Sequence, residues 1–85
     1  MKKPVRLELN NSGSWKLLGR FDAADDDQVA LVLDAAEDLV RTLHNSEDPK
    51  RCPTLRVTID DALCEVLLRW KLDLGWRDVK TGDPL

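Results

Sequence analysis

One amphipathic helix is the feature that most constrains how this chain folds. Over residues 25–44, apolar side chains recur at the three- and four-residue spacing of a single helical face: Val29, Val32, Leu33, Ala36, Val40 and Leu43. Asp25 followed by Gln28 resembles a capping box at the start, and Arg41 lies in the last turn, where a helix favours a cation. Such a helix buries its stripe against another layer, so the flanking segments must supply an apolar surface.

The segments on both sides of the helix alternate between apolar and polar residues, as half-buried strands do. Residues 4–21 predict a hairpin around the turn formers Asn11-Ser12-Gly13. Its predicted inward positions are Val5, Leu7, Leu9, Trp15, Leu17 and Phe21. Residues 54–60 predict a third strand whose inward positions are Leu55, Val57 and Ile59.

Residues 61–76 fit two patterns. Seven apolar side chains share one parity, as in a strand: Cys64, Val66, Leu68, Trp70, Leu72, Leu74 and Trp76. A helical stripe is also present: Leu63, Val66, Leu67, Trp70 and Leu74. The unbroken period of two favours a strand, which we expect to end or bend near residues 72–75 because it would otherwise be unusually long.

These patterns predict an α+β fold. It is a small ββαββ arrangement, with a four-stranded antiparallel sheet and one amphipathic helix packed on one face. The alternative replaces the fourth strand with a second helix over residues 61–72. The 85 residues suit a single domain spanning 1–85, with a polar loop over 45–53 and a flexible tail over 80–85.

Composition bears on where the protein works. No apolar window is long enough to cross a membrane and no signal peptide is recognisable, so we expect a cytoplasmic location and no membrane partner. Cys52 and Cys64 are then expected to be reduced structural thiols rather than a disulfide.

Charge is unevenly distributed along the chain. Residues 22–48 carry nine acidic side chains against Arg41, a net charge of −8, whereas the rest of the chain carries +5. On the predicted strands, the outward positions are rich in cations: Arg6, Lys16, Arg20, Arg56, Arg69 and Lys71. The pattern predicts an acidic helix side and a basic open sheet face. Charged faces of this kind are explained by contact with water alone. The alternative explanation is that the basic sheet face binds an anionic partner.

Aromatic and aliphatic positions bear on the kind of partner. Sheets that bind single-stranded nucleic acid present aromatic rings on their open face, but Trp15, Phe21 and Trp70 all have the predicted inward parity. A candidate protein or dimer contact is formed by apolar residues that point away from the predicted core: Leu31, Ala35, Leu39, Leu18 and Leu67. An isolated exposed leucine needs no such explanation.

Side chains that carry catalysis or bind metals form no recognisable constellation. His44 is the only histidine, and its place near the helix end suits a capping or solvent-exposed role. The acidic runs at residues 25–27 and 60–61 lie at element ends, where carboxylates are normally solvated. One histidine and two distant cysteines make no zinc site, and the glycines are too scattered for a phosphate loop.

We therefore expect no enzymatic activity and no cofactor. The leading hypothesis is a protein-binding or accessory module that uses its charge-segregated surface, with another protein or a second copy of itself as partner. One alternative is nucleic-acid binding through the basic sheet face. Another is a small-ligand or enzymatic role in an oligomeric cleft near Trp70 and Trp76.

Overall fold

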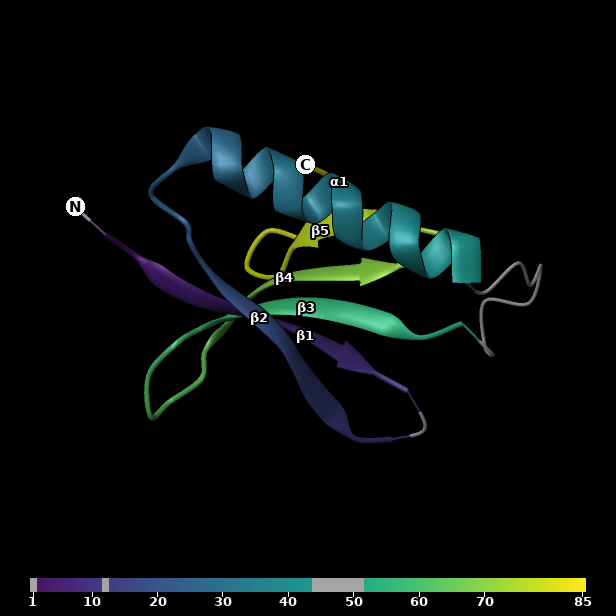
Figure 1. Cartoon of the computed structure of the whole chain (residues 1–85), viewed down its shortest axis with the longest axis horizontal. Coiled ribbons are helices and arrows are strands. Elements are labelled where there is room, and N and C mark those ends of the chain that lie inside the picture. The colour runs from purple at the N-terminus through teal and green to yellow at the C-terminus, as the bar shows by residue number, and fades with distance from the viewer. Residues whose placement is uncertain (1, 12, 44–51) are drawn as a thin grey trace.

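A computed structural model describes residues 2–11, 13–43 and 52–85 (Figure 1). The elements are β1 (Pro4–Asn10), β2 (Trp15–Asp22), α1 (Asp26–Leu43), β3 (Thr54–Ile59), β4 (Val66–Lys71) and β5 (Gly75–Asp78). The strands form one antiparallel sheet in the order β2-β1-β3-β4-β5, and α1 runs along one side of it (Figure 1). The predicted α+β class, with a helix on an antiparallel sheet, is confirmed.

The predicted number of four strands is wrong, because the long fourth strand is two strands joined by a tight turn. Trp70 in β4 lies opposite Trp76 in β5, and Lys71 lies opposite Gly75. Gly75 adopts a φ of 71°, a left-handed conformation that glycine reaches without strain. Both tryptophans face the same side, so the alternation continues through the reversal and hides it. The choice of strand over a second helix is confirmed for Val66–Lys71.

An extra residue in β2 changes which side chains reach the open face. The register of β1 with β2 shifts at Leu18, so Leu17 lies opposite Glu8. Trp15 consequently lies on the open face, while Lys16 faces the helix side. The inward prediction for Trp15 and Leu17 and the outward prediction for Lys16 are therefore wrong. A strict alternation cannot reveal an inserted residue.

A second register shift occurs between β3 and β4. Leu68 lies opposite Val57, but Thr58 lies opposite Val66, which leaves Leu67 as the extra residue. Leu67 packs against the core instead of lying on the open face, so that prediction is also wrong. Val66, predicted inward, shares the open face with Thr58.

The core lies between α1 and the sheet. Its most buried side chains from the helix are Leu33, Ala36 and Val40, and those from the sheet include Val5, Leu55, Val57, Trp70 and Trp76. The Trp76 indole N–H donates to the carbonyl oxygen of Leu33 at 3.2 Å, which ties β5 to the middle of the helix. Leu43, predicted to belong to the buried stripe, is exposed at the helix end.

The helix begins at a network of carboxylate and amide contacts. Asp25 Oδ1 accepts from the amide of Gln28 at 3.1 Å, as a capping residue does. The Gln28 side chain accepts from the amide of Asp22 at 3.0 Å, rather than from that of Asp25. Asp22 Oδ1 in turn accepts from the amides of Lys3 at 2.8 Å and Ala24 at 2.9 Å. The predicted capping box is therefore half formed, and Asp22 joins the N-terminal segment to the helix entry.

Asp22→Asn is expected to lower the melting temperature near neutral pH and to have less effect in acid. The backbone amides of Lys3 and Ala24 hold the pKa of Asp22 below its ordinary value. A depressed carboxyl pKa stabilises the fold above the unfolded pKa, about 3.9, and that stabilisation is lost as the pH falls through the folded value. Thermal unfolding of both proteins between about pH 7 and pH 2 measures the effect. A difference that is constant over this range would contradict the assignment.

The segment that follows β5 is hydrogen-bonded to that strand. After β5, the amide of Leu85 donates to Trp76 O at 3.2 Å and the amide of Asp78 donates to Asp83 O at 3.0 Å. The tail over 80–85, for which the sequence predicts flexibility, is thus hydrogen-bonded along the β5 edge.

The predicted loop over 45–53 lies outside the described residues, apart from Cys52 and Pro53, which are buried. No helix among the described residues is long and apolar enough to cross a membrane.

Candidate functional site

One of the transverse rows of side chains on the open face takes one residue from each strand. In sheet order these are Leu17, Glu8, Arg56, Arg69 and Arg77. Side chains directly opposite one another on neighbouring strands have Cβ atoms about 5 Å apart. Three guanidinium-bearing side chains therefore stand side by side on β3, β4 and β5.

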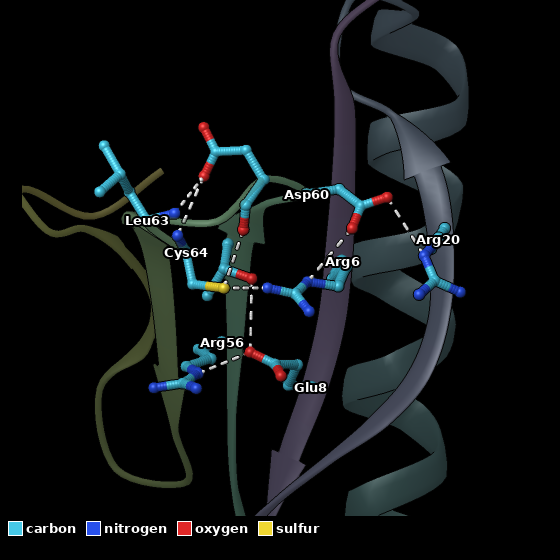
Figure 2. A network of polar contacts seen from close by, with 9 residues as sticks. Arg6, Glu8, Arg20, Arg56, Asp60, Leu63 and Cys64 are labelled. Carbon is cyan, nitrogen blue, oxygen red and sulfur yellow. Dashed lines mark hydrogen bonds and ion pairs between the residues drawn. The ribbon is translucent and has the colours of Figure 1, made fainter.

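The first arginine of this row is neutralised within the sheet. Arg56 Nε donates to Glu8 Oε1 at 2.8 Å, and Thr58 Oγ1 donates to the same oxygen at 3.3 Å (Figure 2). The Arg56 guanidinium also lies over the Trp15 ring, 4.0 Å from its centroid. Glu8 is only 8% exposed, so this carboxylate is a buried counter-ion. Arg56 is held from two sides.

Two further cations share a single carboxylate. Arg20 Nε lies 3.1 Å from Asp60 Oδ2, and Arg6 Nε lies 3.5 Å from Asp60 Oδ1 (Figure 2). The Arg6 contact is too long for a good hydrogen bond, so Arg6 Nε is a buried donor without an acceptor within residues 2–11, 13–43 and 52–85. Arg6 Nη2 also donates to Cys64 Sγ, and that thiol donates to the carbonyl oxygen of Asp61 at 3.1 Å. These contacts attach the loop before β4 to β1.

The remaining open-face cations have no such partner. Arg69, Lys71 and Arg77, hereafter the cation cluster, have no carboxylate within ion-pairing distance among the residues described. Arg77 Nη1 donates to the carbonyl oxygen of Gly82 at 2.9 Å, which orients its guanidinium, while its buried Nε finds no acceptor among the described residues. The uncompensated positive charge of the open face is therefore concentrated on β4 and β5.

The six cations predicted for the basic face thus separate into three groups. Those placed on the open face but paired with carboxylates are Arg6, Arg20 and Arg56. Lys16 lies on the opposite side of the sheet. Arg69 and Lys71 belong to the cation cluster.

Sequence reasoning missed Arg77, the third member of the cation cluster. The signal was present in Asp73 and Gly75, which are both common in turns. Reading a turn at these positions would have placed Arg77 beside Arg69.

The predicted apolar contact is only partly assembled. Leu31 is 71% exposed and Leu39 is 51% exposed on α1, and Ala35 lies exposed between them. Leu18 is half-exposed on the outer strand β2, whereas Leu67 packs into the core and does not join the others. The helix therefore presents three of the five residues as one exposed strip.

The cysteines are both free thiols. Cys52 is buried, and loss of solvent raises the pKa of its thiol, partly offset by the nearby charge of Arg41.

Within residues 2–11, 13–43 and 52–85, no three His, Cys, Asp or Glu side chains lie together as metal ligands would. His44, the predicted capping or exposed histidine, lies outside the described residues.

Comparison with known proteins finds no matching family model, no matching curated protein and no matching solved structure. Function is therefore inferred from the chemistry of the open face itself.

Proposed function

We propose that this chain is a non-enzymatic binding module whose open sheet face docks an acidic segment of another protein. The observation that carries the proposal is the cation cluster. Arg69 and Arg77 are direct cross-strand neighbours, so their like charges repel one another in the free protein. A carboxylate placed over them relieves this repulsion. Lys71 on the same face extends the positive surface along β4.

The opposite layer carries charge of the other sign. Acidic side chains lie along the exposed part of α1: Asp26, Asp27, Asp34 and Asp38. An acidic partner is therefore attracted to the sheet face and repelled from the helix, which orients its approach. A second copy is a poorer partner, because a helix-on-sheet contact between identical chains is heterologous and forms a ring or an open filament rather than a simple two-fold dimer.

Single-stranded nucleic acid is a second candidate, favoured by one specific observation. Trp15 lies on the open face, where an aromatic ring provides a stacking surface for a base. The Arg56 guanidinium already lies over this ring, and Trp70 and Trp76 are buried in the core. A single, partly occupied ring is a weaker platform than nucleic-acid-binding sheets offer, and the net charge of −3 opposes a polyanion.

Two lysine substitutions provide a matched test. Lys71→Glu and Lys16→Glu make the same change at exposed positions on opposite faces of the sheet. We expect the tagged protein to retain a specific protein from nuclease-treated source lysate. Lys71→Glu should lose most of this capture, while Lys16→Glu should retain it, and added salt should weaken it.

Three outcomes would contradict the proposal. Equal capture by both variants would show that the partner does not use the open face. Loss of capture from the unmodified protein after nuclease treatment would favour the nucleic-acid alternative, and Trp15→Ala should then weaken binding of a labelled oligonucleotide. Failure to retain any specific protein would leave the cation cluster as ordinary surface charge.

A further inference from the structure

The cation cluster borders a hollow at the β4–β5 end of the open face. Its volume is about 230 Å³, and its lining combines all three cations with two aliphatic side chains, Leu74 and Val79. Ligand sites for drug-sized molecules span about 300–1,000 Å³, so this hollow suits a group the size of one amino-acid residue. We infer that it is a subsite for a carboxylate attached to an apolar group. The inference rests on the proposed function and adds the chemistry of what the face binds.

The arginine side chains on the positive side of the hollow have hydrogen-bond donors available for a ligand. Arg77 uses Nη1 on the Gly82 carbonyl oxygen, which leaves other donors of the same guanidinium for a ligand, and its buried Nε has no acceptor in the described part of the chain. Arg69 lies directly across from it on β4. A planar carboxylate can accept two parallel hydrogen bonds from a guanidinium, and a fixed guanidinium loses less freedom when it does so.

One acidic residue, Asp78, also lines the hollow, and its carboxylate is already engaged. Asp78 Oδ1 accepts from the amide of Lys80 at 2.8 Å and from the amide of Thr81 at 3.2 Å. These bonds shape the turn after β5. The acidic residue in this lining thus uses its carboxylate on the backbone, so the three cations leave the hollow with an excess of positive charge.

The apolar side of the hollow selects among anions. Leu74 is 46% exposed and Val79 is 40% exposed, so both have surface left to bury against a ligand. An inorganic phosphate would leave these side chains in water. A carboxylate carried next to an aliphatic side chain satisfies the cations and covers the aliphatic wall together. One source of such a group is the C-terminal carboxylate of a protein whose last residue is apolar. The other source is the side chain of an acidic residue that is next to an apolar residue.

Small probes test this chemistry on the full chain. Titrating the isotope-labelled protein with N-acetyl-leucine should shift the amide resonances of Gly75, Val79 and Gly82 saturably, with a dissociation constant of about 1 mM, reasonable for a ligand of this size. N-acetyl-leucinamide, which lacks the charge, should bind at least about tenfold more weakly. N-acetylglycine, which lacks the side chain, should also bind several-fold more weakly, and inorganic phosphate should not compete.

Variants separate the two sides of the hollow. Arg69→Gln should weaken N-acetyl-leucine about tenfold or more, Val79→Ser should remove its advantage over N-acetylglycine, and Lys16→Gln on the opposite face should change neither. Equal binding of the acid and its amide would overturn the inference, as would equal binding of the leucine and glycine probes, or no saturable shift at all.

Peptides then locate the source of the carboxylate. Binding of a peptide with a free C-terminal leucine, but not of its C-terminal amide, would assign the carboxylate to a chain end. Equal binding of an amidated peptide with an internal Glu-Leu pair would assign it to a side chain. If the leucine probe fails while Lys71→Glu still abolishes capture of the protein partner, the subsite is wrong and the proposed function stands.

Discussion

Replacing Trp70 with alanine is expected to lower the free energy of unfolding by about 3–5 kcal/mol, the range for removing a large buried aromatic side chain. Trp70 is fully buried between β3 and β5, directly opposite Leu55 and Trp76. Small domains have total stabilities of about 5–15 kcal/mol, so the variant should be marginally folded. Urea unfolding followed by far-ultraviolet circular dichroism measures the loss without relying on the removed fluorophore.

Phenylalanine at the two buried tryptophans provides the control. Among the described residues, the buried Trp70 indole N–H has no acceptor, whereas the Trp76 indole N–H donates to Leu33 O. Trp70→Phe removes an unsatisfied donor and Trp76→Phe removes a hydrogen bond. Trp76→Phe is therefore expected to be the more destabilising change, by about 1–2 kcal/mol. A larger loss for Trp70→Phe would contradict the assignment of its N–H as an unsatisfied donor.

Glu8→Ala is expected to lower the free energy of unfolding by about 3 kcal/mol, the lower part of the range for breaking a buried ion pair. The change removes the carboxylate that accepts from Arg56 and Thr58, and it leaves Arg56 directly opposite Arg69 without a counter-ion. Part of the loss is repulsion between cations, so added salt should reduce it. Chemical denaturation by urea at low and high salt measures both effects.

A double variant separates the pair from its surroundings. Replacing both Glu8 and Arg56 with leucine removes the two charges together and fills much of the same volume. The double variant should recover most of the stability that Glu8→Ala loses, because no buried charge is left unpaired. If Glu8→Ala lowers the free energy of unfolding by less than about 1 kcal/mol, the contact behaves as an exposed ion pair and its structural role is wrong.

The positions of the cations on the sheet were only partly predictable from the sequence. Arg69 and Lys71 were predicted for the open face and lie there, because the alternation around Trp70 holds within β4. Arg77 was missed, since the strand was expected to end or bend near residues 72–75 and the reversal into β5 was not predicted. Lys16 was misplaced, because one extra residue at Leu18 exchanges the faces of the preceding positions.

The sequence alone determined the elements whose signals are local. The amphipathic helix, its cap at Asp25 and the alternation of β1 and β3 depend on neighbours within a few residues. The α+β class follows from these local patterns. Only the tertiary structure decided the register, because cross-strand hydrogen bonds join residues far apart in the chain. The register includes the two bulges, at Leu18 and Leu67, and the pairing of β5 with β4. It also placed Glu8 against Arg56 and Asp60 between Arg6 and Arg20, and so left the uncompensated charge on β4 and β5.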